Sequence, residues 1–139
     1  MTTEPKPVPI PTPLTAPFWA AAQRHEIALQ RCGECSAAIG YPRLNCPNCG
    51  GRDLDWFTAT GRGRVWSYVV VERADPTFAP DVPYVLAVIE LDEGPRLLSI
   101  VVDVVAAYDM GLLDLAVRAS FETRGAQQVP IFVPIGEGA

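Results

Sequence analysis

The chain has 139 residues, of which 49% are apolar and 19% are charged, and its formal net charge is −5. That length suits one domain or two small modules, and the sequence shows neither a membrane span nor a secretion segment, so we expect a cytoplasmic protein without a membrane partner. Residues 1–64 hold seven Lys/Arg against five Asp/Glu, whereas residues 65–139 hold four against eleven, and this acidic part disfavours a nucleic-acid partner.

The N-terminal segment is rich in proline, with six prolines among residues 5–17. Proline fixes φ and has no N–H donor, so this segment suits neither a helix nor a central strand. We expect an extended, polyproline-like arm over residues 1–15. Two interpretations stay open for it: a disordered tail, or an arm that lies on a partner protein.

A helix is predicted after the arm, with Thr15 as its cap and good helix formers through residues 18–30. It begins with two large aromatic residues, Phe18 and Trp19, which are typical of anchors in a core or an interface. His25 is the single histidine of the chain, and we expect it to be a solvated surface residue.

All the cysteines fall in two Cys-x-x-Cys pairs that are separated by ten residues: Cys32, Cys35, Cys46 and Cys49. Each pair turns two sulfurs toward one point, and two pairs supply the four thiolates of a tetrahedral metal site. Four protein ligands leave no open position, so we predict one structural zinc per chain in a rubredoxin-like ribbon. Iron binds similar ligands and is the alternative metal, while two disulfides are disfavoured in a reducing cytosol.

The remainder of the chain is typical of β-structure, because its apolar runs are short, β-branched and bounded by turn residues. Five strands are predicted, with a helical turn at 104–111 and an irregular loop at 74–83; the strands cover residues 64–73, 84–91, 96–103, 115–123 and 129–133. This order indicates a small closed Greek-key barrel of the OB type, although the pattern alone also fits another five-stranded barrel.

The predicted fold is therefore mainly β: an N-terminal helix and a zinc ribbon followed by a five-stranded OB barrel. We divide the chain into a proline-rich arm (1–15), the helix with the ribbon (16–60), and the barrel with the C-terminal tail (61–139).

The order of motifs resembles a widespread prokaryotic family of small zinc-ribbon/OB-fold proteins. The motifs are the helix that begins FW, then RCGEC, YPR, CPNCG, GRGRVWSYVVV and PYVLAVIELDEG, and the resemblance covers about residues 16–135. Genes of this family commonly accompany thiolases, lipid-transfer-protein-like thiolase homologues or hotdog-fold enoyl-CoA hydratases. Where the family often has a glycine, this chain has Ser36-Ala37-Ala38, which leaves the metal ligands unaffected.

The resemblance implies a non-catalytic subunit that binds or scaffolds acyl-CoA for a thiolase-fold enzyme. That partner is a thiolase or a retro-aldolase acting on acyl-CoA, including steroid-like CoA thioesters, and a hotdog-fold hydratase is a further candidate partner. The residues themselves agree, because all four cysteines are assigned to the metal and no nucleophile is paired with the single histidine. We therefore expect no enzyme activity from the chain alone.

Arginines near the cysteines are suited to the phosphates of CoA, and aromatic residues are suited to its adenine or to a pantetheine channel. Taken singly, each of these side chains is more typical of a solvated arginine or a core aromatic residue. The candidate residues for CoA binding or for a partner interface are Phe18, Trp19, Arg31, Tyr41, Arg43, Arg62, Arg64 and Trp66.

Two other classes of function fit the predicted modules. Zinc ribbons and OB barrels both occur in nucleic-acid-binding proteins, and salt-dependent binding to single strands would favour that class. A rubredoxin-like electron carrier needs iron, which a visible absorption spectrum would reveal.

Overall fold

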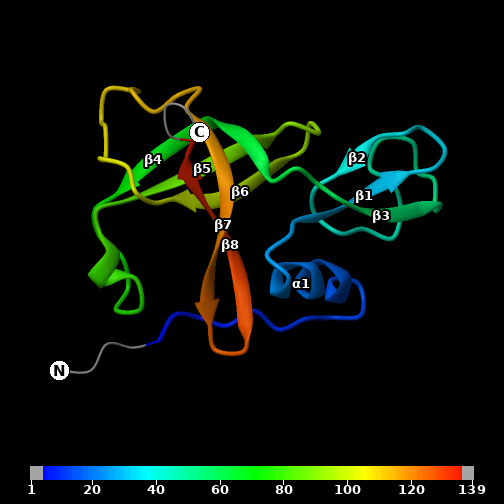
Figure 1. The fold of residues 1–139 in the computed structure, drawn as a ribbon, viewed down its shortest axis with the longest axis horizontal. Helices are drawn as coiled ribbons and strands as arrows, with labels where there is room; N and C mark the ends of the chain where they lie inside the picture. The colour runs from blue at the N-terminus through cyan, green and yellow to red at the C-terminus, as the bar shows by residue number, and fades with distance from the viewer. Residues whose placement is uncertain (1–4, 136–139) are drawn as a thin grey trace.

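The computed structural model describes residues 5–135, which form one α-helix, a small three-stranded sheet and a closed barrel (Figure 1). The first part contains α1 (Ala16–Gln23), β1 (Ala28–Cys32), β2 (Ala38–Ile39) and β3 (Leu54–Thr58), with the antiparallel sheet order β2-β1-β3. The barrel order is β4-β5-β6-β8-β7, with β4 at Arg62–Val71, β5 at Tyr84–Leu91, β6 at Arg96–Val101, β7 at Ala116–Arg124 and β8 at Gln127–Pro134. Among the described residues, no helix is long and apolar enough to cross a membrane.

The barrel strands are rich in apolar residues, and in β5 burial alternates along the strand. In β5, Val85, Ala87, Ile89 and Leu91 are buried, while the residues between them are half-buried on the outer face. All neighbouring strands pair antiparallel except β6 and β8, which are parallel. The five predicted strands and the mainly β, OB-type fold are confirmed.

One hydrophobic core joins the barrel to the sheet that precedes it. Ile27 and Leu29, at the start of β1, belong to the same buried cluster as Val65, Ile89 and Phe132 of the barrel. A separate small cluster lies at the far end of the sheet and contains Cys32, Ile39 and Cys46. The cysteine-bearing end therefore projects from the barrel, as the right side of Figure 1 shows, while its base is part of the barrel core.

The predicted helix is wrong beyond Gln23. The chain turns at His25, whose φ is +59°, and residues 28–30 belong to β1 instead. These residues are good helix formers, but they are buried between two antiparallel partners, and tertiary pairing outweighs a weak local propensity. At the other end, Thr15 makes no side-chain cap bond to the helix, because its hydroxyl contacts that of Thr12 at 3.0 Å.

Two predictions about the barrel loops are also corrected. No helical turn forms at 104–111, where the chain is irregular and Met110 has a positive φ of +66° that interrupts any helix. A short 3-10 helix (Ala79–Asp81) lies instead in the proline-rich loop that was expected to be irregular. The short helix thus lies in the loop at 74–83, and the loop at 104–111 is irregular.

The proline-rich arm lies against the barrel of its own chain. The Lys6 ammonium lies 2.6 Å from the Glu122 carboxylate and also pairs with Asp81, and the Val8 side chain lies beside Gly125 at the β7–β8 turn. Burial lowers the pKa of Lys6, but the hydrogen bonds to Asp81 and Glu122 outweigh this effect and raise the pKa. Residues 1–4 of the predicted arm and 136–139 of the predicted tail lie outside the described residues.

Candidate metal centre and apolar cleft

The four cysteines converge at the projecting end of the ribbon, where their sulfurs all lie within 4.8 Å of one another. The Sγ atoms of Cys32 and Cys49 are 3.6 Å apart, and so are those of Cys35 and Cys46. These distances exclude disulfides and fit a tetrahedron of about 3.8 Å edges, which follows from a zinc–sulfur distance of about 2.3 Å. The four cysteine side chains are thus placed to bind one metal ion through four thiolates.

Main-chain and amide donors surround the sulfurs. The N–H groups of Glu34, Asn48 and Gly51 each lie 3.4 Å from a sulfur, and the Asn48 side-chain amide lies 3.5 Å from that of Cys35. Such donors stabilise thiolates. Each of these main-chain N–H groups belongs to the residue two positions after the cysteine whose sulfur it contacts. Each of the four sulfurs therefore has a hydrogen-bond donor from the loops that carry the cysteines.

The pKa values of two of the thiols, Cys35 and Cys49, shift in opposite directions. The Asn48 amide, followed by the Ala37 N–H, lowers the pKa of Cys35 to about 6. At Cys49, the Gly51 N–H lowers the pKa, but the neighbouring sulfurs, Cys32 foremost, outweigh it and raise the pKa to about 12. The raised pKa of Cys49 means that this thiol keeps its proton near neutral pH, and a bound cation would favour its ionised form.

A second feature is an incomplete seam between β6 and β8. These strands pair at only one register position, Val101 with Phe132. Nearer the ribbon, the next β8 residue that faces β6 is Pro130, which has no N–H to donate, and its carbonyl accepts the Ser99 hydroxyl at 3.0 Å instead. The parallel ladder therefore stops at this proline, and the barrel wall opens there.

The loop after β2 covers the open seam. The Tyr41 hydroxyl accepts a hydrogen bond from the Leu98 N–H of β6 at 2.8 Å. The loop is held in turn by Gln30, a buried side chain that is only 4% exposed and bonds both the N–H and the carbonyl of Arg43, at 2.8 and 3.1 Å. A buried amide thus fixes the position from which Tyr41 reaches the barrel.

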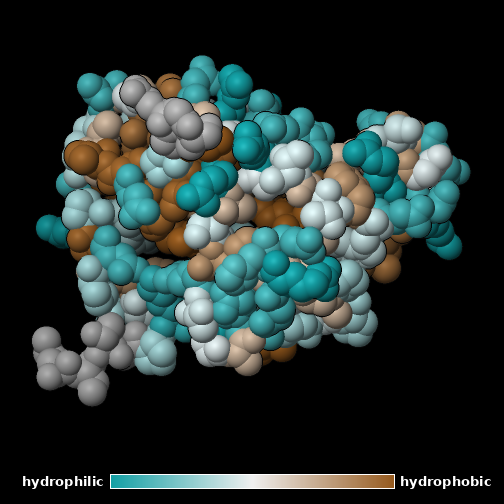
Figure 2. Space-filling view, viewed as in Figure 1, coloured by the Kyte–Doolittle hydropathy of each residue, from teal (hydrophilic) through white to brown (hydrophobic). Residues whose placement is uncertain are grey.

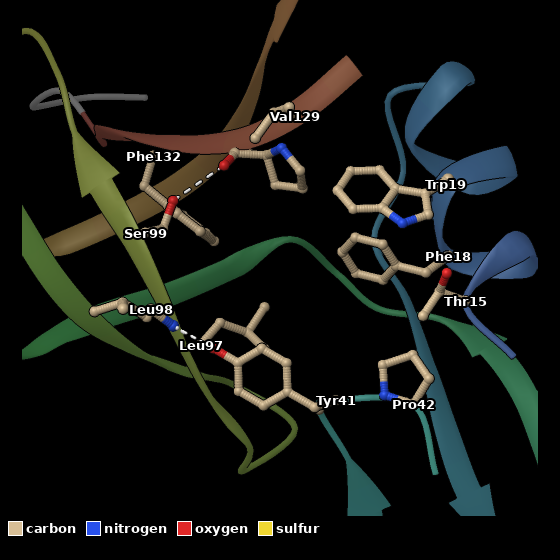
Figure 3. Close-up of a pocket in the computed structure, with 12 residues that line it drawn as sticks. Thr15, Phe18, Trp19, Tyr41, Pro42, Leu97, Leu98, Ser99, Val129 and Phe132 are labelled. Carbon is tan, nitrogen blue, oxygen red and sulfur yellow. Dashed lines mark hydrogen bonds between the residues drawn. The ribbon is translucent and has the colours of Figure 1, made fainter. Parts of the chain in front are cut away.

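The opening forms an apolar cleft of about 260 Å³ between the helix, this loop and the seam (Figure 3). In Figure 3, the rings of Phe18 and Trp19 project from α1 toward β8, and Tyr41 projects from its loop toward β6. The two α1 rings meet edge to face, with centroids 5.0 Å apart. The residues that line the cleft are Thr15, Phe18, Trp19, Gly40, Tyr41, Pro42, Leu97, Leu98, Ser99, Val129, Pro130 and Phe132.

Of the residues proposed from the sequence, Phe18, Trp19 and Tyr41 come together in this cleft. Trp66 does not: it is half-exposed on β4, where the Arg96 guanidinium stacks over its ring at 4.0 Å. The cleft residues contributed by β6 and β8 were not predicted. Only Pro130, a proline inside an apparent strand, gave a local signal of an open edge.

None of the four arginines proposed from the sequence lines the cleft, although Arg43 directly follows Pro42 of the lining. Arg31 stacks over the ring of Phe57 at 4.5 Å and bonds the Ser36 carbonyl at 2.9 Å, and the Arg43 side chain is exposed. The other two lie on β4. Arg62 lines a shallow hollow together with His25 and Arg118, and Arg64 lies 3.9 Å from Asp114 in an exposed pair.

Apolar surface gathers over the barrel. Figure 2 shows it on the barrel side of the molecule, bounded by hydrophilic residues over the β7–β8 hairpin and the ribbon. Three of the large apolar side chains on the barrel strands are at least half exposed: Trp66 at 50%, Val69 at 57% and Leu98 at 60%. An extended apolar surface of this kind is typical of a protein that binds a partner.

A four-sulfur ribbon joined to a closed OB barrel defines a two-module class of zinc-ribbon/OB proteins. Residues 19–55 match the family described as "ChsH2, rubredoxin-like zinc ribbon domain", and residues 56–122 match "ChsH2, C-terminal OB-fold domain". A solved chain of an "Ltp2-ChsH2(DUF35) aldolase" is 32% identical, with a TM-score of 0.76, over 91% of this chain and 98% of that chain. The chain therefore belongs to the ChsH2, or DUF35, family of zinc-ribbon/OB-fold proteins.

Two curated relatives extend this comparison. A "probable enoyl-CoA hydratase alpha subunit" of Thermomonospora curvata is 41% identical over 59% of this chain and 26% of its own length. A "DUF35 domain-containing scaffold protein" of Methanothermobacter thermautotrophicus is 34% identical over 58% of this chain and 62% of its own length. The chain thus spans about a quarter of the hydratase subunit and three fifths of the scaffold protein.

Proposed function

We propose that this chain is a non-catalytic subunit of a thiolase-fold enzyme that acts on acyl-CoA, either a lipid-transfer-protein-like aldolase or a thiolase. The observation that carries the proposal is the likeness, over almost the whole length of both chains, to a chain of the Ltp2-ChsH2 aldolase. The scaffold name of a second relative and the exposed apolar surface of the barrel support the same role. A hotdog-fold hydratase is the other partner class to test, because a relative is named a hydratase α subunit.

The described residues favour a complex in which the partner, and not this chain, catalyses the reaction. Their cysteines are gathered at the metal centre, and the ring of His25 stacks on Phe121 with a centroid distance of 5.0 Å. Neither group is placed as a nucleophile with a base beside it. A metal held by four sulfurs has no open position for substrate, so it supports the ribbon and not a reaction.

We propose zinc as the metal, with one ion per chain. The four thiolates would be its complete ligand set, and the ion would hold together a segment that has only a small core of its own. Metal analysis of the purified protein should give about one zinc per chain and no visible absorption. A red protein containing iron would instead indicate the rubredoxin-like alternative.

The test of function is reconstitution with thiolase-fold and hotdog-fold candidates from the same genome. We expect no turnover of a CoA thioester by the chain alone, and at least a tenfold gain in the partner's activity when the two are co-purified. A partner that is fully active alone, or turnover by the isolated chain, would contradict the proposal. Salt-dependent binding of single-stranded nucleic acid would favour the nucleic-acid alternative instead.

A further inference from the structure

We infer that the cleft at the β6–β8 seam binds the uncharged acyl group of the thioester and not the nucleotide of CoA. This inference rests on the proposed function, and it assigns to this chain the part of the ligand that it contacts. If the inference is right, the chain contributes to the choice of acyl group and does more than hold the partner together.

The lining of the cleft argues against the nucleotide. None of its residues carries a charge, and its walls are aromatic and aliphatic side chains of α1, β6 and β8. The phosphates of CoA need cationic or N–H partners, and three of the arginines proposed for that role, Arg31, Arg62 and Arg64, make contacts elsewhere on the described surface. A phosphate inside this cleft would lose its water without compensation.

Three side-chain hydroxyls that line the cleft already have hydrogen-bond partners within the chain. The Tyr41 hydroxyl receives the Leu98 N–H, the Ser99 hydroxyl bonds the Pro130 carbonyl, and the Thr15 hydroxyl contacts that of Thr12. The two amides of pantetheine would therefore find few partners here, whereas a hydrocarbon needs none. An apolar pocket with few polar groups is the usual environment for an apolar ligand.

Size limits what the cleft holds. Its volume of about 260 Å³ is below the roughly 300–1,000 Å³ of pockets that enclose a drug-sized ligand. That space suits a segment of an aliphatic chain or part of a ring system, with the rest of a larger acyl group extending toward the partner. The edge-to-face rings of Phe18 and Trp19 form one wall, so Trp19 can report occupancy by its fluorescence.

The experiment compares three probes on the metal-loaded full chain without its partner, because an acyl-CoA enzyme would bind CoA by itself. These are decanoyl-CoA, CoA itself, and the decanoyl thioester of N-acetylcysteamine, which keeps the acyl group and lacks the nucleotide. We expect the two decanoyl thioesters to bind within about threefold of each other and CoA to bind at least tenfold more weakly. CoA binding as tightly as decanoyl-CoA, or loss of binding with the nucleotide-free thioester, would overturn the inference.

Two variants locate the binding. Val129→Trp places a large ring in the cleft, and Leu98→Trp does so from the exposed rim, where folding is less at risk. Either variant, if it retains its metal and its unfolding temperature, should weaken decanoyl binding at least tenfold. Val105→Trp, at an exposed loop position outside the cleft, is the matched control and should bind as the wild type does.

The same variants separate this inference from the proposed function. A folded Val129→Trp protein that still binds the decanoyl probes like the control contradicts the inference, even where the partner is fully activated. Activation of the partner by the wild-type chain tests the proposed function, whatever the probes do. Weak probe binding by the cleft variants together with normal binding by Val105→Trp supports the inference.

Discussion

Single residues with buried polar groups set the geometry of both candidate sites. Gln30 is buried at the centre of the ribbon sheet, yet its amide serves a loop thirteen residues away by holding the main chain of Arg43. Through that loop it determines where Tyr41 meets Leu98 at the barrel seam. Gln30 is thus a positioning residue that links the ribbon to the cleft without touching either the metal or a ligand.

Replacing Gln30 by Ala should lower the free energy of unfolding by about 1–3 kcal/mol, because the Arg43 N–H and carbonyl lose their partner. The Leu98 amide should also exchange faster with solvent, since its acceptor Tyr41 would be less well held. Urea unfolding and amide exchange measure the two effects. Gln23→Ala, which removes an exposed bond to the Ala126 carbonyl, is the control and should cost less than about 1 kcal/mol. Equal costs for both variants would contradict this role.

The opposed titration of the cysteines predicts how the metal responds to pH. Cys49, with its pKa raised to about 12, keeps its proton at neutral pH until the metal displaces it. Cys35, with its pKa lowered to about 6, is already a thiolate above that pH. Metal affinity should therefore increase at least about tenfold from pH 7 to pH 8 and decrease on acidification. Competition with a chelator of known pH dependence measures this, and a pH-independent affinity would contradict it.

At the scale of elements, most of the architecture was predictable because it depends on local patterns. The cysteine spacing identified the ligand cluster, and short β-branched apolar runs bounded by turn residues identified the barrel strands. Residues 28–30 were misassigned to a helix, since their β pairing depends on partners that the local pattern does not reveal. The cleft was not predicted because its walls come from four separate segments, which only the folded chain brings together.

Pro130 shows how one residue changes the behaviour of a whole strand. Pro130→Ala restores an N–H that faces β6, so we expect the β6–β8 ladder to extend and the cleft to narrow. Binding of the decanoyl thioesters should weaken at least fivefold, while the free energy of unfolding changes by less than about 1 kcal/mol. Pro134→Ala, on the same strand but outside the cleft, is the control for the loss of a proline. An unchanged affinity would show that the proline does not hold the seam open.

At the scale of the whole molecule, the ribbon and the barrel share one core. Ile27 and Leu29 enter the barrel cluster from the base of the ribbon sheet, so neither part buries its apolar residues alone. The metal centre lies at the opposite end of the same strands, where only a small cluster supports it. Disorder at the metal centre is therefore expected to destabilise β1 and β3 and, through them, the barrel.

Removal of the metal should lower the unfolding temperature of the whole chain by about 10 °C or more, in a single transition. The reason is that disorder in the ribbon exposes the residues that complete the barrel core. Scanning calorimetry with and without a chelator measures this. Two separate transitions, with the barrel unfolding at its original temperature, would show that the two parts are energetically independent.

The walls of the cleft come from opposite ends of the chain, with Phe18 and Trp19 near the beginning and Val129 and Pro130 near the end. During synthesis, the N-terminal wall leaves the ribosome more than a hundred residues before its counterpart. A polypeptide that ends before β8 would retain its four cysteines but would have neither a closed barrel nor the cleft. Assembly that depends on this surface would thereby select finished molecules over incomplete ones.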